Sequence, residues 1–158
     1  MPALQRASQA INAVVEQALF VIGASICIIL FAQVVFRYAG ASLGWSEEVS
    51  RHLLVAITFL GGTVAYKRAS FIGLRGFGHR LGPVAQQAIL IGLQVMTLAG
   101  FGLIAWFGAA YTVKAAEQTS ASLQIPMAIP FSAIPLASLI FMVHVLSDLT
   151  RALERTTE

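Results

Sequence analysis

Charged residues are scarce in this sequence. Asp, Glu, Lys and Arg make up 11% of its 158 residues, whereas 58% are hydrophobic and the mean hydropathy is +0.80. A soluble domain carries about 25% charged residues, so the composition is typical of a membrane protein with no separate soluble domain. The net charge of +3 is small and falls mostly between apolar runs. It therefore indicates membrane orientation and not a nucleic-acid partner.

Cysteine is almost absent too. The single Cys27 sits inside an apolar run, which excludes an internal disulfide and any metal site built on cysteine pairs. The sequence also lacks a Ser/His/Asp arrangement, a phosphate-binding loop, a nucleotide fingerprint and a cluster with metal-ligand spacing. We therefore predict no enzymatic activity, no cofactor and no metal ion.

Apolar stretches make up most of the chain and predict an all-α integral membrane protein with four transmembrane helices. Residues 17–36 carry no charge, and they span about 30 Å as a helix, the thickness of the hydrocarbon core. Residues 52–66 alone would give only about 22 Å, so the second helix should begin near Ser46, acting as its N-cap. Pro135 should kink the last helix if that helix starts by Pro130. The predicted spans within a single membrane domain, residues 1–158, are 14–37, 47–66, 84–111 and 130–150.

A basic segment, residues 68–82, joins the second and third predicted spans. Phe71, Leu74, Phe77 and Leu81 recur every three to four residues, with basic side chains on another side. This pattern predicts a short amphipathic helix lying in the membrane interface against phospholipid headgroups. The basic residues assigned to this contact are Lys67, Arg68, Arg75 and Arg80.

Basic residues are distributed unequally between the two sides of the predicted bundle. The side that holds both termini carries Arg6, Lys67, Arg68, Arg75, Arg80, Arg151 and Arg155. The other side carries Arg37, Arg51 and Lys114. The positive-inside rule therefore predicts that both termini are cytoplasmic.

Charge of both signs is concentrated in residues 36–68. This predicted polar cluster comprises Arg37, Tyr38, Trp45, Glu47, Glu48, Arg51 and His52. Helical spacing allows Glu47 and Glu48 to pair with Arg51, and Glu48 to pair with His52. Three interpretations are open: a solvated, self-neutralising helix start, a polar contact between spans or subunits, and a proton or ion relay. A relay would need acidic ligands deeper in the membrane, which disfavours it.

Two histidines raise the possibility of a haem-binding anchor. His52 lies near the outer end of the second span, whereas His144 lies about 21 Å along the fourth span from that face. This mismatch disfavours a shared haem, and His144 is interpreted as an interior polar group with a partner. Gly61, Gly62 and Ala65 form a small-residue surface that permits close helix packing.

Several motifs resemble the small membrane subunit of tripartite ATP-independent periplasmic (TRAP) transporters, the DctQ-like family. The matching pieces are Phe36-Arg37-Tyr38, Ser42-Leu43, the run from Trp45 to Arg51, Phe59-Leu60-Gly61, Arg68, Ile72, Ile129-Pro130 and Ile134-Pro135-Leu136. The resemblance covers about residues 15–150. Two positions depart from the family pattern: Phe71 stands at the usual histidine, and Arg75 at a commonly acidic position.

The resemblance implies a non-catalytic subunit in the bacterial inner membrane that scaffolds a large, multi-span transport subunit. In that family a periplasmic substrate-binding protein transiently delivers an organic acid, often a dicarboxylate or sialic acid, and an ion gradient such as sodium drives uptake. Two alternatives are a self-sufficient, homo-oligomeric small transporter and a haem-binding membrane anchor. The former would need an ionisable residue deep in the membrane, and the first span has none after Glu16.

Overall fold

Five α-helices make up the regular structure of the described residues. The computed structural model describes residues 2–76 and 83–154. The helices are α1 (Pro2–Tyr38), α2 (Gly44–Gly76), α3 (Pro83–Ala115), α4 (Ala128–Phe131) and α5 (Ala133–Glu154). Four segments are long and apolar enough to cross a membrane: Leu4–Tyr38, Gly44–Arg68, Gln87–Ala115 and Ala128–Leu153. The predicted all-α, four-span architecture is confirmed.

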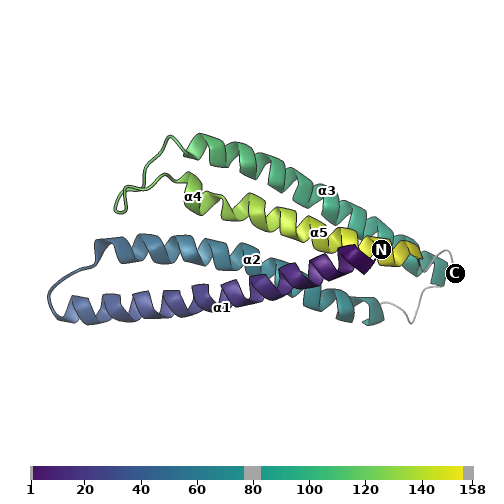
Figure 1. The fold of residues 1–158 in the computed structure, drawn as a ribbon, viewed down its shortest axis with the longest axis horizontal. Coiled ribbons are helices and arrows are strands. Elements are labelled where there is room, and N and C mark those ends of the chain that lie inside the picture. The colour runs from purple at the N-terminus through teal and green to yellow at the C-terminus, as the bar shows by residue number, and fades with distance from the viewer. Residues whose placement is uncertain (1, 77–82, 155–158) are drawn as a thin grey trace.

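The helices form two hairpins that lie side by side. α1 pairs with α2, α3 pairs with α5, and α2 packs on α5 between the two outer helices (Figure 1). The start of α1 crosses toward α5, while α1 and α3 are not in contact within residues 2–76 and 83–154. The α1–α2 and α3–α4 connections lie at one end, here called the loop end. The start of α1 and the end of α5 lie at the opposite, terminal end.

α2 is longer than the sequence predicted at both ends. It begins at Gly44, and the hydroxyl of Ser46 donates a hydrogen bond to the Leu43 carbonyl at 2.7 Å instead of capping the helix. At the other end α2 runs without interruption to Gly76. The expected separate interfacial helix is, up to this residue, a continuation of α2, because this part of the chain contains no proline to end it. Residues 77–82 of the predicted segment lie outside the described residues.

The last span is interrupted where proline chemistry predicts a kink. α4 ends at Phe131, Ser132 separates it from α5, and Pro135 occupies the first turn of α5. Pro135 has no N–H to donate to the carbonyl four residues earlier, that of Phe131, and its ring crowds that carbonyl. The regular ladder resumes one residue later, where the Leu136 N–H donates to the Ser132 carbonyl at 3.2 Å. The interruption lies at the predicted place, and the kink itself stays a prediction.

The interior of the bundle is built from small and polar side chains. The buried apolar residues are Val15, Val64, Ala115, Ala137 and Val145. The buried polar residues are Ser8, Ser46, Thr63, Lys67, Ser120, Ser138, His144 and Ser147. Large apolar side chains such as Phe20 and Phe31 on α1, and Met96 and Phe107 on α3, point outward. In lipid such residues gain little from burial, so packing and polar contacts must hold the helices together.

Two close contacts join neighbouring helices of the bundle. The Phe141 ring of α5 stacks on Phe101 of α3 with centroids 3.8 Å apart, and lies 4.7 Å from the ring of Tyr66 on α2. Nearer the loop end, α3 approaches α5 at Gly108. A Cβ at this position would lie 3.4 Å from Ile134 Cγ2 and 3.5 Å from Pro135 Cδ. Glycine therefore permits the close approach of α3 to the first turn of α5.

Candidate functional site

The α3–α4 connection, residues 116–127, is folded back on itself by backbone hydrogen bonds. The Ser120 N–H donates to the Ile125 carbonyl at 2.9 Å, and the Met127 N–H donates to the Gln118 carbonyl at 2.9 Å. Gln124 adopts a left-handed backbone with φ of 54° at the turn. The folded loop presents donors from Ser120 and Ser122 to the first turns of α2.

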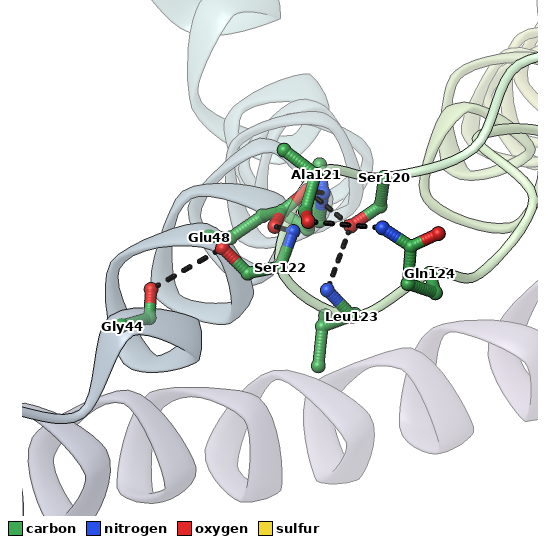
Figure 2. Close-up of polar contacts among 8 residues, drawn as sticks. Gly44, Glu48, Ser120, Ala121, Ser122, Leu123 and Gln124 are labelled. Atoms are coloured by element: carbon green, nitrogen blue, oxygen red, sulfur yellow. Dashed lines mark hydrogen bonds and ion pairs between the residues drawn. The ribbon is translucent and has the colours of Figure 1, made fainter.

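Glu48 of α2 receives those donors. Its Oε2 accepts the Ser122 N–H at 2.9 Å, and its Oε1 accepts the Ser120 hydroxyl (Figure 2). The Ser122 hydroxyl also reaches the Gly44 carbonyl at 3.5 Å, and His52 Nε2 lies 3.7 Å from Glu48 Oε1. Hydrogen bonds to an ionised acceptor are stronger than those between neutral groups. The loop-end cluster, defined as Glu48, His52, Ser120 and Ser122, thus links the first hairpin to the second.

The loop-end cluster differs in part from the predicted polar cluster. The Glu48–His52 pairing forms as its spacing predicted. Within the described ranges, however, Arg51 makes no ion pair with Glu47 or Glu48 and remains exposed. The Glu48 carboxylate is occupied by the loop donors and lies beside His52 instead.

The remaining members of the predicted polar cluster stay on the surface near the loop end. Tyr38 is 91% exposed, and Arg37, Trp45 and Glu47 are exposed as well. Their assignment as a subunit contact remains a prediction. No sequence pattern predicts that Ser120 and Ser122 are the partners of Glu48, because these residues are more than 70 positions away along the chain.

A second cluster links three helices at the terminal end. Ser8 Oγ of α1 and His144 Nδ1 of α5 share a hydrogen bond of 2.8 Å. Lys67 Nζ of α2 lies 3.6 Å from Asp148 Oδ1 of α5, and the two side chains are only 6% and 11% exposed. Charges this far from water are stable only when they are paired. The terminal-end cluster, defined as Ser8, Lys67, His144 and Asp148, therefore holds α5 against α1 and α2.

This second cluster corrects the role predicted for Lys67. The side chain points into the bundle toward Asp148 and not toward the headgroups, because Asp148 supplies the opposite charge at the same end. The adjacent Arg68 is exposed, and its guanidinium lies 3.0 Å from Glu16 Oε1 of α1. The side chain of Arg75, together with the whole of Arg80, lies outside the described part of the structure. The sequence contains a sign of the Lys67–Asp148 pair. Asp148 is the only charged residue in the predicted span 130–150, and an embedded charge needs a partner of opposite sign.

The two histidines considered as haem ligands, His52 and His144, belong to different clusters. His52 pairs with Glu48 at the loop end, whereas His144 is fully buried and bonded to Ser8 at the terminal end. The interior partner expected for His144 is therefore present. Axial ligation of one haem by both residues is incompatible with their placement at opposite ends of the bundle.

The small-residue surface of α2 is not a contact among residues 2–76 and 83–154. A Cβ built at Gly61 or Gly62 would meet nothing within 4 Å, and Ala65 is exposed. The close helix packing expected here is found instead at Gly108 of α3. The surface of α2 is uncovered because α1 and α5 pack on other sides of that helix.

The fold and the two clusters define a multi-pass α-helical membrane protein in which charged side chains link helices to one another. In the part of the chain that the structure describes, no group of three His, Cys, Asp or Glu residues is placed to hold a metal ion. The family model of tripartite ATP-independent periplasmic transporters, DctQ component, matches residues 26–155. The chain belongs to this family, as its motifs predicted, and is a membrane component of a TRAP transport system.

One curated relative shares this similarity. The chain is 30% identical over 135 residues to the isethionate TRAP transporter permease protein DctMQ of Oleidesulfovibrio alaskensis. The match covers 79% of this chain and 21% of that relative, so this chain spans about a fifth of the relative's length.

Proposed function

We propose that this chain is the non-catalytic small permease subunit of its TRAP transporter and acts as a scaffold for the large transport subunit. The observation that carries this proposal is the linkage of the two hairpins at both ends, by Glu48 at the loop end and by Lys67–Asp148 at the terminal end. Links at both ends favour two hairpins that stay fixed relative to each other over hairpins that move during transport. The embedded charges are engaged in these links, which disfavours a self-sufficient ion-coupled carrier.

The transport cycle that this scaffold serves is the ion-gradient-driven uptake of an organic acid. In this proposal a periplasmic binding protein delivers the acid, and the large subunit carries the substrate and sodium sites. Dicarboxylates and sialic acids are candidate substrates from the family resemblance. The name of the DctMQ relative adds isethionate, a small sulfonate, to these candidates.

The uncovered face of α2 is the surface we assign to the large subunit. Glu47, Arg51, Thr58, Gly62 and Ala65 recur at spacings of three to four or seven residues, and all are exposed. The small residues of this face would let the backbone of another transmembrane helix approach closely. Lipid chains can cover a helix without such a close approach. The outward faces of α1 and α3 expose many large apolar side chains, which suit hydrocarbon, whereas α2 exposes Trp45 and Leu54 among its described residues. We therefore infer that a transmembrane helix of the large subunit packs along this face.

The orientation follows from the distribution of basic residues. We propose that the terminal end faces the cytoplasm and the loop end faces the periplasm of the inner membrane. Exposed Tyr38 and Trp45 then lie on the side from which the binding protein approaches. Arg68, Arg75 and Arg80 follow the second span on the cytoplasmic side, where anionic headgroups attract basic segments.

Bulk added to the uncovered face of α2 tests the proposal. Gly62→Leu places a large side chain at a position where a Cβ would meet no described atom outside its own stretch of helix within 4 Å. Ala99→Leu, on the exposed surface of α3, is the matched control. Each variant is co-expressed with the large TRAP subunit from the same genome, and complex recovery, uptake and the thermal stability of the purified chain are measured.

We expect Gly62→Leu to reduce recovery of the complex and uptake at least tenfold, with thermal stability unchanged, and Ala99→Leu to behave as wild type. Equal recovery of the complex for both variants would refute the assigned contact face. Substrate uptake by this chain alone would favour the self-sufficient transporter, and a haem absorbance band in the purified chain would favour the haem anchor.

A further inference from the structure

Three buried polar atoms on one face of α5 have no hydrogen-bond partner among the described residues. They are Nε2 of His144, Oγ of Ser147 and Oδ2 of Asp148. His144 and Ser147 are fully buried, and Asp148 is nearly so. Positions three and four residues apart are neighbours on a helix surface, so the three side chains share one face of α5.

The other polar atoms of two of these residues are already fixed by protein partners. Nδ1 of His144 is bonded to Ser8 of α1, and Oδ1 of Asp148 lies beside Lys67 of α2. These contacts orient the imidazole and the carboxylate, so their second polar atoms are held in place by the terminal-end cluster. Buried polar groups in native proteins are almost always hydrogen-bonded, to protein or to ordered water.

We propose that His144, Ser147 and Asp148 form a binding site for an ordered water molecule inside the terminal-end cluster. Asp148 Oδ2 can only accept a hydrogen bond, whereas the Ser147 hydroxyl can donate or accept. His144 Nε2 donates when its Nδ1 accepts the Ser8 hydroxyl. A ligand that both donates and accepts would satisfy all three atoms, and buried waters typically make about three such bonds.

Charge balance argues for a neutral ligand over an ion. A cation at this site would lie close to the ammonium group of Lys67, and an anion would lie close to the carboxylate of Asp148. Because Lys67 and Asp148 neutralise each other, the site has no net charge to offset that of an ion. The bound water instead completes the hydrogen bonding of α5 at the point where α1, α2 and α5 meet.

Ser147→Ala removes one ligand of the proposed water, and Ser138→Ala is the matched control. Ser138 is equally buried on the same helix, but its hydroxyl donates to the Ile134 carbonyl at 2.9 Å. The chain is reconstituted in lipid nanodiscs, and infrared difference spectra are recorded between samples in H₂¹⁶O and H₂¹⁸O. Nitrogen-15 NMR of His144 provides a second measurement that does not depend on assigning the water band.

We expect the wild type to show an isotope-sensitive O–H stretching band of bound water that Ser147→Ala shifts or abolishes and Ser138→Ala preserves. The Nε2 resonance of His144 should move in Ser147→Ala only. The proposal is overturned if Ser147→Ala leaves both signals unchanged, or if the two variants alter them equally. A response of the His144 resonance to chloride, without an isotope-sensitive band, would also overturn it by identifying an anion.

Discussion

Removal of the Asp148 carboxylate is the strongest single test of how the two hairpins are held together. Lys67 and Asp148 are 6% and 11% exposed, with 3.6 Å between Nζ and Oδ1. Truncating one partner of a buried ion pair costs about 3–5 kcal/mol, because the other charge loses its counter-ion away from water. A lysine near the end of a span can partly extend toward the interface, which favours the lower value. We therefore expect Asp148→Ala to destabilise the fold by about 3 kcal/mol, roughly a hundredfold in the unfolding equilibrium.

The unfolding equilibrium can be measured on the purified chain in bicelles by steric trapping. Glu16→Ala is the matched control, because it breaks the ion pair with Arg68, whose side chain is 71% exposed. Exposed pairs contribute little to stability, so this control should behave almost as wild type. Exchanging the two buried charges, Lys67→Asp with Asp148→Lys, should recover part of the loss. A loss in Asp148→Ala no larger than that in Glu16→Ala would refute the reasoning.

Two further predictions concern the contacts between the hairpins and within the second one. Gly108→Leu should destabilise the fold by about 1–3 kcal/mol through overpacking against the first turn of α5. Gly100→Leu, at a position where a Cβ would meet nothing within 4 Å, should not. Thermal unfolding of both variants tests this. Glu48→Gln should weaken the bonds to the α3–α4 loop and speed hydrogen exchange at the Ser122 amide, whereas Glu47→Gln on the exposed surface should leave it unchanged. Equal exchange in the two variants would argue against Glu48 as the residue that orders the loop.

The sequence predicted the presence of each helix better than the residues at which it begins and ends. Uncharged runs of sufficient length predicted all four spans, because a backbone in hydrocarbon must satisfy its own hydrogen bonds. The start of α2 at Gly44 and its extension to Gly76 were missed, since charge near the interface does not end a helix. Proline correctly predicted an interruption of the last span, because the missing N–H of a proline removes a backbone hydrogen bond close to it in the chain. The interruption at Ser132 follows directly from Pro135.

The partners of the charged residues needed the tertiary structure. Spacing along one helix predicted the Glu48–His52 pair, but not the hydrogen bonds from Ser120 and Ser122, which come from another hairpin. Lys67 was assigned to the headgroups because its neighbours in sequence are basic, yet it pairs with Asp148 inside the bundle. Only the packing of α2 against α5 brings those two side chains together.

Composition and hydrophobic run length by themselves determined that this is a four-span membrane protein, and a few motifs determined its transporter family. Both are local properties of the chain, governed by the cost of placing charge and unpaired backbone in lipid. Tertiary structure alone decided which charges meet between different helices and which face of α2 stays uncovered. Those outcomes depend on the rotation of each helix about its axis, which is set by contacts between residues far apart in sequence.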